Sequence, residues 1–130
     1  MPPGGLGMAL LGVLGAGAMG AWSRYLLGLA LRGRSVEFPW GTLTINVLGC
    51  ILVAMAGSLA AAVPGWAPFI GRDVMIGFIG AFTTFSTFTV ETLLLLEQAP
   101  LAAGLYVGGS TLAGLLAVGF GWWLAARLGF

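Results

Sequence analysis

The chain has 130 residues, of which 59% are hydrophobic and 7% are charged, with a formal net charge of +1. So few charged side chains cannot cover a soluble domain of this size, so we predict an integral membrane protein. The small net charge offers no basic surface for nucleic acid. The lack of histidine and the single cysteine exclude an internal disulfide and a thiolate or imidazole metal cluster.

Four apolar stretches are long enough to cross a bilayer as helices, which takes about 20 residues. They run roughly over residues 6–31, 41–63, 74–96 and 101–126. The first residues lack a basic region, so we expect a retained helix there and no cleaved signal peptide. A turn ending at Pro39 suits a helix start, and Asp73 is expected to cap the third helix. The sequence predicts an all-α membrane protein with a single four-helix transmembrane domain over residues 1–130.

The arginines are balanced between the two faces of the membrane. With four spans, Arg72 and Arg127 fall on one face and Arg32 and Arg34 on the other. Orientation follows the Lys/Arg bias of short loops, and that bias is nearly absent here. We therefore favour insertion in both orientations (dual topology), with two copies paired as an antiparallel homodimer. The alternative is that a small residual bias selects one orientation.

Small residues recur at every fourth position in two of the spans. They are Gly12, Ala16 and Gly20 in the first span and Gly104 and Gly108 in the fourth. Because small residues let helix backbones approach closely in lipid, we expect both sets to be packing surfaces.

Three polar side chains fall inside predicted spans, where unpaired polar groups are costly. Asn46 either makes an interhelical hydrogen bond or donates to a passing anion. Arg24 either extends to the membrane surface or gives an aqueous vestibule a positive potential. Glu91 marks proton or cation coupling, anchors a hydroxyl or pairs with Arg24, and the sequence does not decide among these.

The most informative segment is residues 77–88 of the third span, GFIGAFTTFSTF. Its serine and threonine hydroxyls can bond to the preceding turn and bend or interrupt a helix. An interrupted helix frees carbonyl oxygens that can coordinate a cation. The positive edge of a phenyl ring can face a small anion, and hydroxyls can replace its lost hydration. The segment indicates an anion path, and since no catalytic motif accompanies it we predict that the protein is not an enzyme.

Three motifs in order give the chain a resemblance to the CrcB/Fluc family of fluoride channels over nearly its whole length. They are small residues 15–17 leading to Arg24-Tyr25, residues 40–49 (WGTLTINVLG), and residues 77–91. The resemblance implies a passive fluoride-selective channel that exports fluoride and lowers cytoplasmic fluoride. It also implies an antiparallel homodimer with two pores, multi-pass in the lipid of the bacterial cell inner membrane.

The resemblance also implies roles for particular residues of the second and third spans. Phe85 and Phe88 would be the pore-facing rings, and Asn46 would donate a hydrogen bond in the pore. Ser86 and Thr87 would belong to the polar lining.

In the fourth span the resemblance allows two alignments. One places Tyr106 and Ser110 in the pore lining. A gapless alignment selects Thr111 and puts Val107 at the position of the tyrosine.

Three further implications concern the entrance and a bound metal. Arg24 would lie in the vestibule. For Glu91, which belongs to the third motif, gating or support of the pore is a possible role. The carbonyl oxygens of Gly80 and Thr83 would hold a structural sodium ion at the dimer interface.

The same length, span number and charge balance also fit two other classes of membrane protein. A small dual-topology multidrug or cation exporter needs an acid in its first span, where this chain has Arg24 and no acid. A non-transporting assembly module would use the small-residue faces, but it would not account for the phenyl and hydroxyl groups at residues 82–88.

Overall fold

The computed structural model describes residues 5–31 and 38–130. Within them four helical stretches are long and apolar enough to cross a membrane, which confirms the prediction of an all-α chain with four spans. Their bounds are Gly5–Ala30 (α1), Trp40–Ala62 (α2), Pro64–Gln98 and Pro100–Leu128 (α6). Pro39 directly precedes α2, as expected. The predicted turn with Arg32 and Arg34 lies outside the described residues.

The third stretch is made of several pieces and is interrupted, which confirms the predicted break. It comprises η1 (Pro64–Trp66), α3 (Ala67–Phe69), the π-helical η2 (Ile70–Ile79), α4 (Gly80–Phe82) and α5 (Phe85–Gln98). The prediction that Asp73 caps this helix was wrong, because Asp73 lies inside η2. Pro64 and Pro68 each stand in the first turn of a helical piece, where a missing N–H costs nothing, so the helical path starts earlier than expected.

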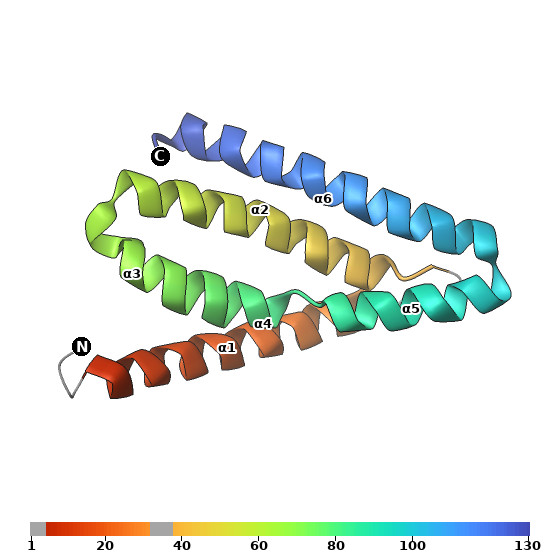
Figure 1. The fold of residues 1–130 in the computed structure, drawn as a ribbon, viewed down its shortest axis with the longest axis horizontal. Helices are drawn as coiled ribbons and strands as arrows, with labels where there is room; N and C mark the ends of the chain where they lie inside the picture. Colours follow the sequence, from red (N-terminus) through yellow and green to blue (C-terminus); the bar gives the residue numbers. More distant parts are fainter. Residues whose placement is uncertain (1–4, 32–37) are drawn as a thin grey trace.

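The helices lie side by side in the order α6, α2, η2 and α1 (Figure 1). Beyond the break, α5 turns away from α1 and packs against α6 instead. The start of α1 and the end of α6 lie at the same end of the bundle, as an even number of spans requires (Figure 1). The break therefore lies where the chain changes its packing partner.

The small residues of α1 make its close contact with η2, which confirms the predicted packing surface. A Cβ atom added to Gly20 would lie 2.2 Å from the carbonyl oxygen of Phe78. One added to Gly12 would lie 2.1 Å from Oδ1 of the buried Asp73. The methyl group of Ala16 also faces η2. Side chains at these two glycine positions would push α1 away from the third stretch.

The corresponding prediction for α6 was wrong for packing within the chain. A Cβ atom on Gly104 or Gly108 would meet nothing within 4 Å. The contacts of α6 with α2 instead use Gly121, where an added Cβ would lie 2.8 Å from the Ala54 methyl carbon. The face of α6 that carries Gly104 and Gly108 is left for lipid or for another protein surface.

Candidate functional site

The break in the third stretch consists of two threonines in extended conformation. Thr83 has φ −81° and ψ 162°, and Thr84 has φ −150° and ψ 116°. The Oγ1 atom of Thr84 accepts from the N–H of Thr87 at 3.3 Å and so caps α5. The hydroxyl of Thr83 donates to the carbonyl of Ile79 at 3.0 Å. The hydroxyl groups thus bond to the main chain on both sides of the break, as the sequence predicted.

Asn46 of α2 holds the break from one side. Its Nδ2 donates to the Thr84 carbonyl at 3.1 Å, and its Oδ1 accepts from the Thr84 N–H at 2.9 Å. In a continuous helix that N–H would bond to the Gly80 carbonyl. Of the two alternatives for Asn46, the structure shows the interhelical hydrogen bond. Within the part of the chain that the structure describes, the second hydrogen of the amide has no acceptor.

Gly49, three residues after Asn46 on α2, makes room for the break. A Cβ atom at this position would lie 2.1 Å from Cγ2 of Thr83. Since the Thr83 hydroxyl is already bonded to Ile79, the methyl group cannot turn away without losing that bond. Asn46 and Gly49 therefore fix the break against one face of α2.

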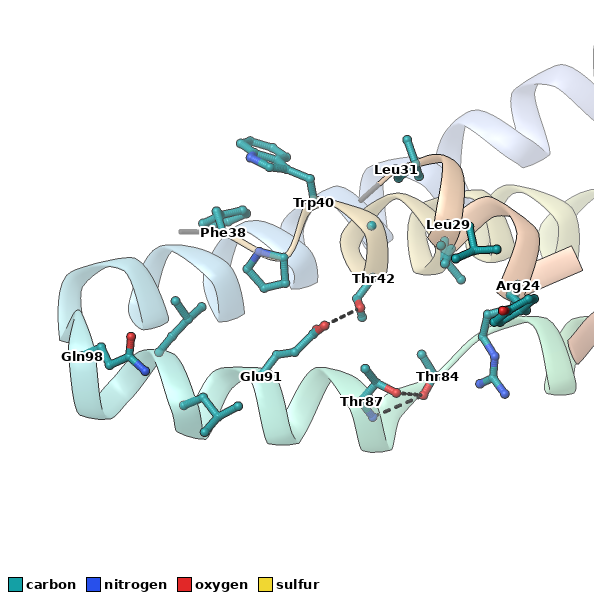
Figure 2. A pocket seen from close by; sticks show the side chains of 17 residues that line it. Arg24, Leu29, Leu31, Phe38, Trp40, Thr42, Thr84, Thr87, Glu91 and Gln98 are labelled. Atoms are coloured by element: carbon teal, nitrogen blue, oxygen red, sulfur yellow. Dashed lines mark hydrogen bonds between the residues drawn. The ribbon is translucent and has the colours of Figure 1, made fainter. Parts of the chain in front are cut away.

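Arg24 approaches the break from α1. Its Nη1 donates to the Thr83 carbonyl at 3.3 Å. Arg24 also lines a cavity of about 580 Å³, together with Thr42, Thr84 and Glu91 (Figure 2). Within residues 5–31 and 38–130 it makes no ion pair with Glu91. Arg24 therefore lies at the cavity and donates a hydrogen bond to the break.

Glu91 of α5 joins three helices through two hydroxyl groups. Its Oε1 accepts from Thr42 of α2 at 2.9 Å, and its Oε2 accepts from Tyr106 of α6 at 2.8 Å. Tyr106 is fully buried. Of the alternatives for Glu91, the structure shows the one in which its carboxylate binds hydroxyl groups. These bonds tie α5 to α2 and α6 after the break.

Phe85, Phe88 and Tyr106 form a row of aromatic rings. The centroids of Phe85 and Phe88 are 5.9 Å apart, and those of Phe88 and Tyr106 are 5.0 Å apart. The Phe85 side chain is 79% exposed. Phe82, to which no pore role was assigned, is buried and stacked on Phe78. The row thus runs from the surface of the chain to the buried Tyr106.

The remaining hydroxyl groups divide between the break and α6. Ser86 and Thr87 are exposed at the start of α5, with their hydroxyl oxygens 3.4 and 3.0 Å from Oγ1 of Thr84. The Ser110 hydroxyl is buried and has no hydrogen-bond partner among the described residues. Thr111 is exposed and donates to the carbonyl of Val107 in its own helix at 2.8 Å.

Thr42 is a residue beside the break whose contact the sequence did not predict. It lies four residues before Asn46, so both side chains fall on one face of α2. It is buried and donates to Glu91. Its position one helical turn from Asn46, a polar residue in the same span, could have predicted that Thr42 also has a polar partner.

Comparison with known proteins relates the chain to one family. Residues 10–122 match the family described as CrcB-like protein, Camphor Resistance (CrcB). A protein of Bordetella bronchiseptica named fluoride-specific ion channel FluC is 43% identical over 106 residues, covering 81% of each chain. Proteins of the same name from Acidobacterium capsulatum and Nitratidesulfovibrio vulgaris are 40% and 44% identical. The match to the Acidobacterium protein covers 93% of this chain and 98% of the relative. The match to the Nitratidesulfovibrio protein covers 83% of this chain and 87% of the relative.

Proposed function

This chain belongs to the CrcB family and is a fluoride-specific ion channel, and we propose that fluoride crosses passively along the polar side of its broken third helix. Movement down its gradient would then lower cytoplasmic fluoride. The observation that carries the proposed path is the extended Thr83-Thr84 pair inside a membrane-spanning stretch, beside a cavity whose lining includes polar side chains such as Thr87 among apolar ones. Irregular backbone at membrane depth is tolerated where it is buried in protein or lines a water-filled space.

The groups near the break favour an anion. The N–H groups of Phe85 and Ser86 begin α5, where a helix has no partners of its own for them. Further positive or donor groups are the edges of Phe85 and Phe88, the hydroxyl of Ser86 and the second amide hydrogen of Asn46, which has no acceptor among the described residues. Together with Thr87 they would replace the hydration of a small anion by several weak contacts, which suits conduction better than one tight site.

We propose that Tyr106 and Ser110, with Thr111 as the alternative position, extend this lining from α6. The support is geometric. Tyr106 is the buried end of the aromatic row, and the Ser110 hydroxyl is a buried donor without a partner in the part of the chain that the structure describes. Glu91 would support the pore by holding Tyr106 in place.

A single chain leaves Phe85 largely exposed, so we propose that a second copy completes the path as an antiparallel homodimer in the lipid of the bacterial inner membrane. The even distribution of arginines supports insertion in both orientations. The domain proposed for residues 1–130 would then be one protomer of a dual-topology pair.

A structural sodium ion at the dimer interface belongs to the same proposal. The Gly80 carbonyl has lost its helical donor, because the Thr84 N–H bonds to Asn46. The Thr83 carbonyl accepts from Arg24. Carbonyl oxygens freed by a broken helix are suitable sodium ligands, so Gly80 and Thr83 fit the ion, with one oxygen shared with a guanidinium group. The ion would supply a positive charge that holds the two breaks together.

Purified protein in liposomes, monitored with fluoride and chloride electrodes, tests the proposed function. We expect fluoride efflux with little chloride efflux, and reduced fluoride efflux for Phe85→Ile and Phe88→Ile. Phe120→Ile, at an exposed ring of α6 stacked on Trp123, is the control and should conduct normally. Unchanged efflux in both test variants would refute the path.

The alternative of a multidrug or cation exporter predicts ethidium efflux driven by a pH gradient. We expect none, because the first span carries Arg24 and no acid for proton exchange. Ethidium transport in the same liposomes would support that alternative instead.

A further inference from the structure

Several polar main-chain groups at the break have hydrogen-bond partners on side chains, as polar groups inside a membrane require. Asn46 satisfies both the N–H and the carbonyl of Thr84. The Thr84 hydroxyl satisfies the N–H of Thr87. The Thr83 carbonyl has one hydrogen-bond donor among the described residues, and it is Nη1 of Arg24. Each of these side chains thus fixes a different part of the break.

The position of Arg24 follows from the packing of α1. Gly20 lies one turn earlier on the same face of α1, where it touches the main chain of Phe78. That contact brings α1 close to the third stretch just before the break. The N–H groups of α1 are used within its own helix, so a long side chain is the means by which α1 can donate to Thr83.

The guanidinium group suits this contact. It is planar and carries five N–H donors, so one can hold a carbonyl while the others face water. Figure 2 shows the Arg24 side chain beside the linker that carries Thr84, at the edge of the cavity. A hydrogen bond from a charged donor is stronger than a neutral one.

We propose that Arg24 is a positioning residue, which holds the Thr83 carbonyl and thereby sets the course of the main chain through the break. Asn46 fixes Thr84 from α2, and Arg24 fixes Thr83 from α1. With both in place, the donor groups at the start of α5 keep their direction toward the path. The consequence for fluoride flux rests on the proposed function, whereas the consequence for the break does not.

The two roles of Arg24 differ in their dependence on salt. A charge that attracts anions from a vestibule acts through solvent and is screened, with a Debye length of about 10 Å at 0.1 M and about 3 Å at 1 M. A hydrogen bond to a partly buried carbonyl is much less sensitive. A variant lacking the side chain should therefore show a defect at the break that high salt neither mimics nor removes.

Hydrogen exchange in lipid nanodiscs tests the proposal without relying on fluoride flux. We expect Arg24→Met to speed exchange of the Thr84 and Thr87 N–H groups about tenfold or more, the effect of losing one hydrogen bond to a charged group. Arg24→Lys, which keeps the charge on a shorter side chain, should show a rise of about threefold. Arg127→Met, at an arginine that lies over Trp123 near the end of α6, is the matched control and should leave both N–H groups unchanged.

Fluoride efflux of the same variants completes the test. Arg24→Met should conduct less than wild type by a similar factor at about 0.1 M and about 1 M salt. Exchange at Thr84 and Thr87 within about twofold of wild type in Arg24→Met would overturn the proposal, whatever the flux. If Arg24→Met does not assemble, unchanged exchange at Thr84 and Thr87 in Arg24→Lys would overturn the proposal instead. If Arg24→Met shows raised exchange but the wild-type protein itself gives no fluoride efflux, the positioning role stands and the proposed function is refuted.

Discussion

The contact between Asn46 and Thr84 gives the most direct prediction for the stability of the break. Asn46→Ala removes two hydrogen bonds, of 3.1 and 2.9 Å, and leaves the Thr84 N–H and carbonyl without these partners. Each hydrogen bond contributes about 0.5–1.5 kcal/mol net, and interhelical ones in membranes average about 0.6 kcal/mol. We therefore expect the variant to lose about 2 kcal/mol, which corresponds to roughly 30-fold in the equilibrium between the held and released break.

Unfolding in mixed detergent micelles measures this loss, and fluoride efflux from liposomes measures its effect on function. Ser58→Ala on the same helix is the control, because its hydroxyl donates only to the carbonyl of Ala54 one turn earlier. It should stay within about 0.5 kcal/mol of wild type. If Asn46→Ala also stays within that limit, the argument that Asn46 holds the break is refuted.

Asn46→Asp distinguishes the role of the donating nitrogen of the amide from that of its accepting oxygen. The acid keeps an oxygen that accepts from the Thr84 N–H, but it places a second oxygen against the Thr84 carbonyl. A charged carboxylate would also repel an anion in the path. We expect a larger loss of fluoride efflux than in Asn46→Ala, and efflux equal to that of wild type would contradict the proposed path.

Two further variants probe the neighbours of the break. Gly49→Ala should cost about 1–3 kcal/mol, more than the gain of up to about 1 kcal/mol in helix propensity, because its Cβ would lie 2.1 Å from the Thr83 methyl carbon. Gly57→Ala, whose Cβ meets nothing within 4 Å, is the control and should be neutral or stabilising; equal unfolding free energies for the two would contradict the close contact. Tyr106→Phe removes the donor to Glu91 and should cost about 0.6–1.5 kcal/mol in the same unfolding assay. A loss of stability below about 0.3 kcal/mol would show that this bond does not tie α5 to α6.

Much of the fold follows from local sequence. Runs of apolar residues predicted the four spans, and consecutive hydroxyl residues after Gly80 predicted the break. Both features arise from residues that are close together in the sequence. The early start of the third helical stretch was not predicted. The third span was expected to begin near residue 74, but Pro64 and Pro68 stand in first helical turns, where a proline breaks no hydrogen bond.

The sequence by itself determined that this chain crosses the membrane four times and that residues 77–88 of its third crossing can interrupt a helix. The structure placed the interruption at Thr83-Thr84. Only the tertiary structure decided which groups hold that interruption, since Asn46 and Arg24 lie 38 and 59 residues away in the chain from the threonines they bind. It also decided that Glu91 accepts from Thr42 and Tyr106 and does not pair with Arg24. A polar group in a membrane must find a partner, but which partner it finds depends on which helices pack together, and this in turn depends on close contacts such as those of Gly20 and Gly49.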